Sequence, residues 1–459
     1  MLKIYNSLTQ NKELFTPLQT GKINIYVCGP TVYDYCHMGN ARSFAAFDVV
    51  VRYLRYRGYE VTYTRNITDI DDKIINRANE NKEPFMAVVE RFTQAMHEDL
   101  AQLKLLIPDH EPRATEFIAP IIAMIETLLK NGYAYVAQNG DVYYDVRKFK
   151  DYGLLAHRDI DKLESGARVD IVDVKHDPLD FVLWKLAKPG EPKWESPWGE
   201  GRPGWHIECS AMSTGLLGES FDIHGGGKDL IFPHHENEIA QSEAATGKKF
   251  VNVWMHAGYL QIEKEKMSKS LGNFFTVRDL LAKYSGEVLR YFLVVSHYRS
   301  SLHYSEDAIK QAENSLTRFY IALRSLPDAK PIKNSEFEAK FIEAMDDDFN
   351  SPIAVSVLFD LAHEIQRLRD KNDLATAAAH GALLKNLAGV LGLLQTDPEQ
   401  FLQAGKDELD VSKIEALIVA RNKARQEKNW AEADRIRQEL VGMKVVLEDG
   451  AQGTTWKRG

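Results

Sequence analysis

The order of local patterns over residues 22–68 constrains the fold more than any other feature of the chain. Residues 22–28 alternate in a strand-like way and run into a Gly-Pro pair, which ends a strand. Residues 41–57 carry apolar side chains at helical spacing, and Gly58 is a natural helix stop. Residues 60–68 return to a strand pattern. This order predicts the opening of a Rossmann-like parallel α/β sheet, whose ligands bind beyond the carboxyl ends of the strands.

The turn at residues 28–40 and Thr68 should therefore lie near a common crevice. The turn ends in the tetrapeptide 37–40, His-Met-Gly-Asn, at the start of the first predicted helix. A helix N-terminus offers unpaired N–H groups and a positive dipole end, so it suits a triphosphate. Gly39 would let a nucleotide approach the backbone, while His37 and Asn40 can donate side-chain hydrogen bonds. A purely structural role is the alternative for the histidine.

Residues 266–270 read Lys-Met-Ser-Lys-Ser, a short basic loop with two ammonium groups three residues apart. Two lysines held on a turn suit the neutralisation of charge on a departing polyphosphate. The alternative is a solvated, lysine-rich surface loop. At roughly 5% usage per residue type, a preset string of five is expected in about one chain of this length in several thousand. The fixed order therefore favours a catalytic role for Lys266 and Lys269.

A further short strand is predicted at residues 221–224, and three glycines follow it. Gly225, Gly226 and Gly227 would let a nucleotide approach closely. Asp229 could accept hydrogen bonds from ribose hydroxyls. A tight turn with a capping aspartate is the alternative explanation of this segment.

The rest of the chain predicts an insertion, a helical bundle and a small terminal domain. Residues 121–202 are irregular and rich in Pro, Trp and Gly, and long amphipathic helices then follow at 305–326, 336–345, 352–370 and 375–394. The end of the chain predicts basic helices at 411–428 and 430–441 and a hairpin at 444–458. The expected fold class is α/β. We expect a Rossmann-like parallel-sheet catalytic domain (1–120 and 203–303, with the lysine loop 266–270), a connective insertion (121–202), an α-helical bundle (304–400) and a small C-terminal α+β domain (401–459).

Composition limits the classes of function. With 459 residues the chain should form several domains, and its net charge of −9 excludes a bulk nucleic-acid coat protein. Any RNA contact must come from a local basic surface. The first residues lack a signal-peptide pattern, and the longest apolar stretch, 117–129, is interrupted and too short to span a bilayer. Three cysteines make no disulfide framework, so we expect a cytoplasmic protein without membrane contact.

Residues 233–247 predict a helix that begins at Pro233 and ends at Gly247. Residues four apart share a helical face, so His234 and Glu238 should point the same way. His235 would instead pair with the apolar Ile239, which argues against a ligand role for His235. One imidazole and one carboxylate on one face are half of a zinc site.

Two cysteines could complete that site. Cys28 ends the first predicted strand, and Cys209 follows the segment 204–208, Gly-Trp-His-Ile-Glu. Together with His234 and Glu238 they would form a set of two thiolates, one imidazole and one carboxylate. Packing as small buried hydrophobes is the alternative for both cysteines. Cys36, beside the 37–40 turn, is expected to pack.

Several segments resemble the cysteinyl-tRNA synthetases, a family of class I aminoacyl-tRNA synthetases, over essentially the whole chain. The segments are 28–34 (Cys-Gly-Pro-Thr-Val-Tyr-Asp), 66–73 (Asn-Ile-Thr-Asp-Ile-Asp-Asp-Lys), 204–210 (Gly-Trp-His-Ile-Glu-Cys-Ser) and 224–238, which begins His-Gly-Gly-Gly-Lys-Asp-Leu. Residues 266–270 match the second class I signature letter for letter. The first signature, His-Ile-Gly-His, differs here at Met38, which only fills space, and at Asn40, which keeps a donor but cannot carry a positive charge.

The resemblance implies a metal site and a substrate site. Its four metal ligands fall on Cys28, Cys209, His234 and Glu238, which would hold one Zn2+ per chain. Zinc prefers a soft thiolate, so it would select cysteine over serine, whereas an apolar pocket separates such near-isosteres by only ~10–200-fold. The implied contacts with the bound amino acid are Gly29, Thr68 and Trp205, with core packing as the alternative for the tryptophan.

The resemblance also implies a two-step ligation. The carboxylate of L-cysteine attacks the α-phosphorus of ATP, which binds with Mg2+, and the cysteinyl group then passes to the 2′-hydroxyl of tRNA(Cys). The carboxylate is already ionised, so catalysis is positioning and charge stabilisation. His37 and Asn40 would hold the phosphates, and Lys266 and Lys269 would close over the leaving group. We expect a monomer.

The C-terminal segment is the expected RNA contact. Residues 413–444 hold eight Lys or Arg against five Asp or Glu, and a tryptophan in this segment can stack on an unpaired base. The family reads the anticodon with this domain. Arg425, Trp430, Asp434 and Asp449 match positions implicated there. A solvated helix pair with a core tryptophan is the alternative.

Two other functions are open to the same residues. An amide-forming ligase would activate cysteine identically and pass it to an amino sugar, but it should lack the module at residues 411–459. A catalytically inactive RNA- or zinc-binding protein would have no need of intact Lys266 and Lys269 or of four intact candidate ligands.

Overall fold

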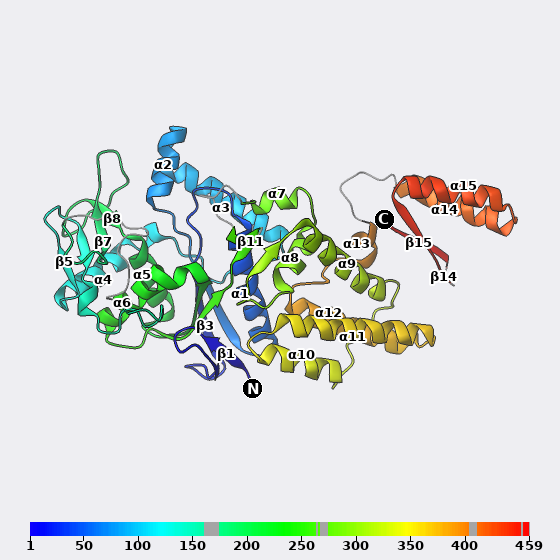
Figure 1. The fold of residues 1–459 in the computed structure, drawn as a ribbon, viewed down its shortest axis with the longest axis horizontal. Coiled ribbons are helices and arrows are strands. Elements are labelled where there is room, and N and C mark those ends of the chain that lie inside the picture. Colours follow the sequence, from blue (N-terminus) through cyan, green and yellow to red (C-terminus); the bar gives the residue numbers. More distant parts are fainter. Residues whose placement is uncertain (160–173, 263–264, 267–273, 404–410, 451–452, 459) are drawn as a thin grey trace. The chain divides into compact units, whose positions relative to one another are not determined.

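The computed structural model describes residues 1–459 apart from 160–173, 263–264, 267–273, 404–410, 451–452 and 459 (Figure 1). The chain divides into two compact units. Unit 1 comprises Met1–Ile309, Ala339–Val355 and Val390–Gly392, and unit 2 comprises Lys310–Glu338, Ser356–Gly389 and Leu393–Gly459.

A parallel four-stranded sheet lies at the centre of unit 1. Its strands are β3 (Lys22–Val27), β4 (Glu60–Arg65), β9 (Phe221–Gly227) and β10 (Val251–Ala257), in the order β10-β9-β3-β4. All three neighbouring pairs are parallel, and helix α1 (Met38–Tyr56) connects β3 to β4. The predicted strand, helix and second strand are confirmed, and so is the α/β fold class.

Close packing of α1 on the sheet explains one of the three glycines that end β9. A side chain on Gly225 would lie 2.2 Å from the ring of Phe47 on α1. Phe47 itself is almost fully buried, as are Val50, Val51 and Leu54 on the same helix. Gly225 is therefore required by the contact between helix and strand, whatever its relation to a ligand.

The predicted insertion contains an antiparallel sheet of its own, although its sequence pattern is irregular. Its strands are β5 (Ala134–Val136), β6 (Val142–Tyr144), β7 (Phe181–Leu186) and β8 (Gly201–Pro203), in that order across the sheet. Most of these strands are only three residues long, so no alternation can be recognised in them. The sheet packs with α4 (Ile118–Lys130), α5 (Trp205–Leu217) and α6 (Glu236–Thr246) around one apolar core.

Further short elements complete unit 1. The remaining strands are β1 (Lys3–Asn6), β2 (Asn11–Leu14), β11 (Leu260–Ile262), β12 (Glu265–Lys266) and β13 (Leu302–Tyr304). The remaining helices are α2 (Asp72–Asn81), α3 (Phe85–Gln102), α7 (Val277–Leu281) and α8 (Gly286–Val294).

The long helices predicted after residue 304 are present. They are α9 (Glu306–Leu323), α10 (Glu336–Asp346), α11 (Ser351–Asp370) and α12 (Leu374–Val390). A short helix that was not predicted, α13 (Pro398–Gln403), follows them. Across the described ranges, no helix combines the length and apolar character needed to cross a membrane.

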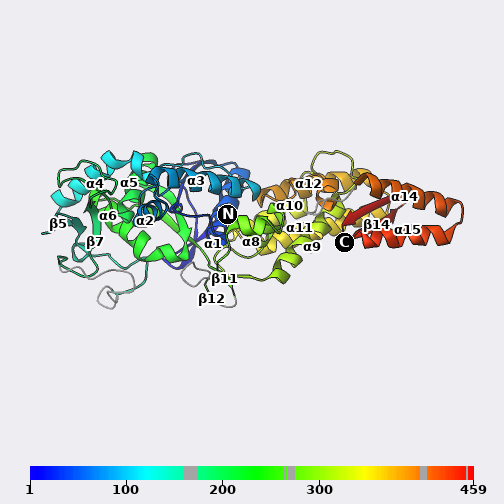
Figure 2. The same ribbon diagram turned by 90° about the horizontal axis from the view of Figure 1, so that it is seen from above.

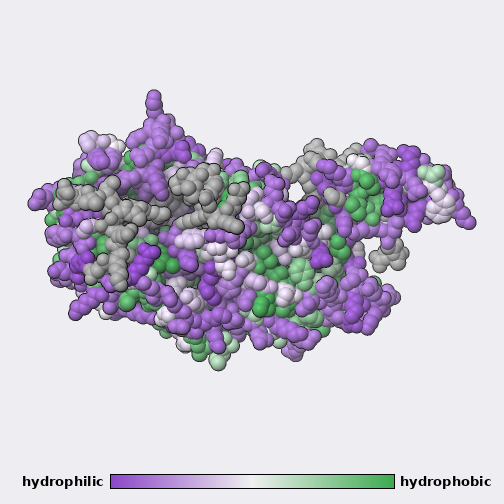
Figure 3. All heavy atoms as spheres, viewed as in Figure 1, coloured by the Kyte–Doolittle hydropathy of each residue, from purple (hydrophilic) through white to green (hydrophobic). Residues whose placement is uncertain are grey.

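The C-terminal part of unit 2 is a helix pair with a hairpin. Helices α14 (Val411–Gln426) and α15 (Trp430–Gly442) lie side by side in both views, next to the antiparallel strands β14 (Val445–Gly450) and β15 (Gly453–Arg458) (Figures 1 and 2). A small core joins them, made of Ile414, Ile418, Ile436, Leu440, Val445 and Trp456. The face of the helix pair drawn in Figure 3 is mainly hydrophilic.

Candidate metal centre and nucleotide crevice

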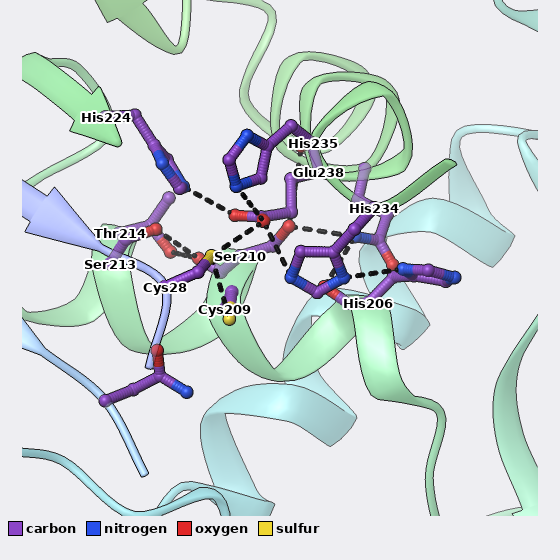
Figure 4. Close-up of polar contacts among 12 residues, drawn as sticks. Cys28, His206, Cys209, Ser210, Ser213, Thr214, His224, His234, His235 and Glu238 are labelled. Carbon is purple, nitrogen blue, oxygen red and sulfur yellow. Dashed lines mark hydrogen bonds and ion pairs between the residues drawn. The ribbon is translucent and has the colours of Figure 1, made fainter. Parts of the chain in front are cut away.

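The four predicted metal ligands meet in one buried cluster, although they come from three separate segments (Figure 4). Cys28 directly follows β3, Cys209 lies on α5, and His234 belongs to a π-helical turn at Ile231–His235 that leads into Glu238 on α6. Cys28 Sγ lies 3.7 Å from Cys209 Sγ and 3.4 Å from Glu238 Oε1. His234 Nε2 lies 3.0 Å from the same Glu238 oxygen.

These spacings fit a tetrahedral metal site. Zinc binds thiolate sulfur at about 2.3 Å and nitrogen or oxygen at about 2.0–2.1 Å, which sets tetrahedral edges of roughly 3.8 Å between two sulfurs and 3.3–3.6 Å for the other pairs. The observed separations of 3.7, 3.4 and 3.0 Å lie close to those edges. All four ligand atoms fall within 4.8 Å of one another, and all four residues are buried. The donor set can therefore hold a metal ion, and its two thiols favour a soft one.

Electrostatics already prepare the cluster for a cation. Burial raises the pKa of the Cys28 thiol, and the hydrogen bond that Cys28 donates lowers the pKa of Cys209 to about 6. Burial opposes the ionisation of Glu238, but His224 and His234 outweigh it and hold the pKa of this carboxyl well below its usual value. The cluster thus gathers two thiols and a carboxylate in a buried place, where negative charge needs a cationic partner.

His235 also lies near the cluster, although its pairing with Ile239 argued against a ligand role. His235 Nε2 lies 4.0 Å from Glu238 Oε1, and Cys28, His224, His235 and Glu238 form a second group of suitable donors. Phe232 has non-helical backbone angles, so the regular helix begins only at Glu236 and not at Pro233. Residues three apart on a helix also share a face, and the argument from residues four apart left this relation out.

Histidines outside the predicted set surround the ligands. His224 Nε2 lies 2.8 Å from Glu238 Oε2, and the Nδ1 atoms of His206 and His234 are 2.8 Å apart. His235 Nδ1 lies 2.8 Å from His256 Nε2, and burial lowers the pKa of His256 to about 3. Such outer partners orient metal ligands. In the sequence, only the similarity of segment 224–238 to the resembled family indicates His224. No local pattern indicates His256.

The predicted amino-acid contacts border the same place. Trp205 keeps 37% of its surface exposed and stacks on His234 with ring centroids 4.2 Å apart, so core packing is the wrong interpretation of this tryptophan. Thr68 is buried and donates its backbone N–H to Pro30 O at 3.2 Å. Gly29 donates to Asn66 Oδ1 at 2.8 Å, and a side chain on Gly29 would lie 1.6 Å from Asn66 O. The turn after β3 and the loop after β4 therefore lie side by side.

The first signature begins helix α1. His37 is its N-cap, and His37 Nδ1 accepts the Asn40 N–H at 3.2 Å, while Gly39 lies tightly beside the His37 ring. The first turn of α1 carries no acidic residue, so its positive end is not neutralised from within the helix. Cys36 is buried, which agrees with its predicted packing role.

The segment that follows the lysine loop pairs with this turn. Met38 N donates to Phe275 O at 3.1 Å, and Val277 N donates to Cys36 O at 2.8 Å. Lys266 closes β12, which pairs with β11, whereas Lys269 lies outside the described residues. The far end of the loop is thus fixed at the start of α1.

The other glycines after β9 have packing reasons as well. A side chain on Gly226 would lie 2.9 Å from the ring of His235, and one on Gly227 would lie 2.6 Å from Asp229 Oδ1. The nucleotide contacts of these residues remain predictions.

The predicted RNA contacts divide into two groups. Trp430 is 60% exposed, and Trp456 fills the small core instead, so core packing is the wrong interpretation of Trp430. Arg425 Nη1 lies 3.1 Å from Asp449 Oδ2, which brings these two predicted residues together. Asp434 lies exposed on α15.

Comparison with known proteins first defines the class. Residues 14–314 match the family model of the tRNA synthetases class I (C) catalytic domain. Two solved synthetases share the fold. One is a Mycobacterium tuberculosis methionyl-tRNA synthetase in complex with methionyl-adenylate, with a TM-score of 0.57 and 15% identity over 83% of this chain and 91% of that chain. The other is a putative arginyl-tRNA synthetase from Campylobacter jejuni, with a TM-score of 0.53 and 13% identity over 83% of this chain and 95% of that chain. The fold and the site therefore define a class I aminoacyl-tRNA synthetase.

The family within this class follows from full-length relatives. Residues 340–395 match the DALR domain, and residues 411–456 match the cysteinyl-tRNA ligase anticodon binding domain. The chain is similar over its whole length to cysteine–tRNA ligases of three organisms. They are those of Stutzerimonas stutzeri (62% identity over 99% of both chains), Pseudomonas aeruginosa strain UCBPP-PA14 (62% identity over 100% of this chain and 99% of the relative) and Coxiella burnetii (59% identity over 100% of both). The chain belongs to the cysteine–tRNA ligase family and is a ligase.

Proposed function

We propose that this enzyme activates L-cysteine with ATP and transfers the cysteinyl group to tRNA(Cys). The observation that carries the proposal is the buried cluster of two thiols, an imidazole and a carboxylate. The cluster of thiols suits a sulfur-bearing substrate, and the start of α1 suits a polyphosphate.

Cys28, Cys209, His234 and Glu238 would hold one Zn2+ per chain. When bound, zinc supplies a soft centre that prefers the substrate thiolate to the hydroxyl of serine. Trp205 stacks on His234 and keeps part of its surface exposed in the crevice, where it would cover the amino acid. Gly29, in the turn after β3, and Thr68, in the loop after β4, would border the amino acid.

Activation needs positioning rather than proton transfer. The cysteine carboxylate attacks the α-phosphorus of ATP, an O–P bond forms, and pyrophosphate leaves with its Mg2+. His37 and Asn40 would hold the phosphates at the start of α1, where Gly39 leaves room, and the segment from Gly225 to Asp229 would border the nucleotide. Lys266 and Lys269 would neutralise the leaving group.

The terminal domain would read the tRNA. Exposed Trp430 offers a free ring face for stacking on a base, and Arg425, Asp434 and Asp449 are the proposed polar contacts. We propose the four-part division predicted above (1–120 with 203–303, 121–202, 304–400 and 401–459) and a cytoplasmic monomer. The three cysteines are free thiols, which suits a reducing compartment.

An amide-forming ligase for cysteine is the second candidate, since it would share the crevice. The match of residues 411–456 to the anticodon binding domain does not favour it, because transfer to an amino sugar needs no such module.

The decisive test is amino-acid-dependent exchange of pyrophosphate into ATP, measured with zinc-analysed protein and every standard amino acid. We expect exchange with cysteine, none above background with serine, and charging of tRNA(Cys) transcripts. Exchange driven equally by serine would contradict selection by the metal centre. Cysteine-dependent exchange without tRNA charging would favour the amide ligase.

A further inference from the structure

Arg42 is a buried cation that the proposed mechanism does not use. It lies in the second turn of α1, and only 1% of its surface is exposed. The guanidinium donates only to backbone oxygens: Nη1 to Leu293 O, and Nη2 to Ser296 O at 3.3 Å, His297 O at 2.7 Å and Ser300 O at 3.5 Å. Its Nε has no hydrogen-bond partner among the described residues.

The other buried arginines have acidic partners. Six arginines are buried in the part of the chain that the structure describes. Five of them pair with a carboxylate: Arg65 with Glu111, Arg202 with Asp72, Arg290 with Asp48, Arg324 with Glu399 and Arg421 with Asp449. Arg42 is the exception. A buried charge without a counter-ion is destabilising, so this exception needs a reason.

The end of helix α8 offsets only part of the charge. Leu293 lies in the last turn of α8, and Ser296 and His297 follow the helix, so Arg42 lies at its negative end. Such a helix end is equivalent to roughly half an elementary charge, so about half of the guanidinium charge is left unpaired. Burial lowers the pKa of Arg42 to about 10, which still leaves the group protonated at neutral pH.

This charge lies behind the turn that is proposed to hold the phosphates. Residues three and four apart share a helical face, so Arg42 lies on the same face of α1 as Met38 and Gly39. Arg42 is two residues after Asn40, a rise of about 3 Å along the helix axis. The charge of Arg42 therefore adds to the positive end of the α1 dipole.

The acidic groups nearest in the sequence have cationic partners of their own. The first turn of α1 carries no acidic residue. Asp34 in the preceding turn lies 3.2 Å from Arg77 Nη2, and Asp48 further along α1 lies 2.8 Å from Arg52 Nε. These carboxylates do not cancel the positive potential at the start of α1, and a bound polyanion would be stabilised by it.

We propose that Arg42 supplies a buried positive charge to the polyphosphate of ATP at the start of α1. Protein interior screens such a charge less than water screens an exposed lysine, so the guanidinium can act on the phosphates without touching them. Arg42 is in this sense a positioning residue, held in place by its bonds to the end of α8. The inference rests on the proposed function, because it takes ATP as the substrate.

The test compares a ligand that has phosphates with one that has none. Arg42→Met removes the charge and keeps the length of the side chain. We expect the KM for ATP in cysteine-dependent pyrophosphate exchange to rise roughly 10-fold, the effect of an interior charge about 10 Å from a phosphate. The KM for cysteine and the zinc content should not change. Adenosine carries no phosphate, so its inhibition constant against ATP should be the same in variant and parent.

A merely structural role predicts a different pattern. If Arg42 only holds the end of α8, the variant should bind ATP and adenosine equally poorly, and this result would overturn the inference. An unchanged KM for ATP would overturn it as well. A parent protein without cysteine-dependent exchange would instead contradict the proposed function.

Arg42→Lys is the conservative variant, because it keeps the charge but cannot donate to several carbonyls at once. It should recover most of the affinity for ATP that Arg42→Met loses. A KM for ATP as high as that of Arg42→Met would show that the bonds to α8, and not the charge, are needed. If Arg42→Met does not fold, Arg42→Gln replaces it in the same comparison of ATP with adenosine, since glutamine is neutral and keeps a donor for the carbonyls.

Arg290→Met is the matched control for loss of a buried arginine. Arg290 lies on α8 and pairs with Asp48 on α1, about 15 Å along the helix from Met38. This variant should lower the temperature of thermal unfolding at least as much as Arg42→Met, because it also removes a partner of a buried carboxylate. Its KM for ATP should stay at the parental value. An equal rise in the KM for ATP would overturn the inference, since any buried arginine between α1 and α8 would then have the same effect.

Discussion

At the scale of single residues, Glu238 organises the candidate metal centre. Its Oε1 faces Cys28 and His234, and its Oε2 faces His224 at 2.8 Å. A carboxylate that is fully buried can remain ionised only with such partners. The thiols then complete a donor set that no single element of the chain could provide.

Cys209→Ser should remove the metal and leave the nucleotide side of the crevice intact. A serine oxygen is harder than a thiolate and does not ionise at neutral pH, so the site loses a soft charged ligand. We expect zinc well below one per chain by elemental analysis. We also expect the KM for cysteine to rise by more than about 100-fold, since loss of an outer partner alone costs 10–100-fold. ATP binding, measured by calorimetry, should persist.

Cys36→Ser is the matched control, because Cys36 is also a buried free thiol but lies outside the donor set. It should keep its zinc. A Cys209→Ser protein with one zinc per chain would show that Cys209 is not a ligand.

Residue patterns revealed part of this site before the structure did. The spacing of His234 and Glu238 on one predicted helix was enough to pair them. Cys28 and Cys209 are 181 residues apart, and only resemblance or the folded chain can bring them together. His256 carries no local signal, because its position comes from burial against segments distant in sequence.

At the scale of elements, the short helix α7 depends on its neighbours. Five residues cannot form a stable helix alone, so α7 relies on a capping box between Thr276 and Asp279 and on Arg278. Arg278 Nε lies 3.1 Å from Asp99 Oδ1 on α3, and the guanidinium also lies over the ring of Tyr35. These contacts fix the segment that pairs with the first signature.

Arg278→Ala should therefore weaken ATP use. Asp99 is 1% exposed and would lose its cationic partner, so we expect stability to fall by about 1–2 kcal/mol, a value reduced because Arg278 itself is partly exposed. The KM for ATP should rise severalfold, while zinc content stays constant.

Arg91→Ala is the control on α3, the helix that carries Asp99, since Arg91 forms a surface ion pair with Glu83. Thermal unfolding and the kinetics of pyrophosphate exchange should differ between the Arg278→Ala and Arg91→Ala variants. Equal behaviour would show that Arg278 does not fix the turn.

The elements also differ in how far sequence could predict them. The helix at 41–57 was predictable because apolar residues recur along it, and the structure places α1 at Met38–Tyr56. The strands of the insertion were not, because three residues are too few to show a period. The helix expected from Pro233 starts at Glu236, since a π-helical turn precedes it.

At the scale of the whole molecule, the terminal helix pair and hairpin are held in unit 2 by one buried arginine. Arg324 directly follows α9, and its Nε and Nη2 each lie 2.6 Å from Glu399 on α13. Its Nη1 lies 3.2 Å from Glu448 on β14, and Nη2 donates to Trp456 O on β15 at 2.8 Å. The arginine thus connects the two sides of the boundary that sequence placed at residue 400, and no sequence pattern indicates this contact.

Arg324→Lys should separate the two steps of the proposed reaction. Lysine keeps the charge but cannot make the two-pronged contact with Glu399 and the further bonds to the hairpin, so the RNA-binding module would be held less rigidly. We expect pyrophosphate exchange to stay at the parental rate, since the crevice lies in unit 1, and kcat/KM for tRNA charging to fall severalfold through a higher KM for tRNA. Arg318→Lys, an exposed position on the same helix α9, is the matched control and should charge tRNA normally. An equal fall in exchange and charging would mean that Arg324 supports general stability, and unchanged charging would mean that the position of the module does not depend on this arginine.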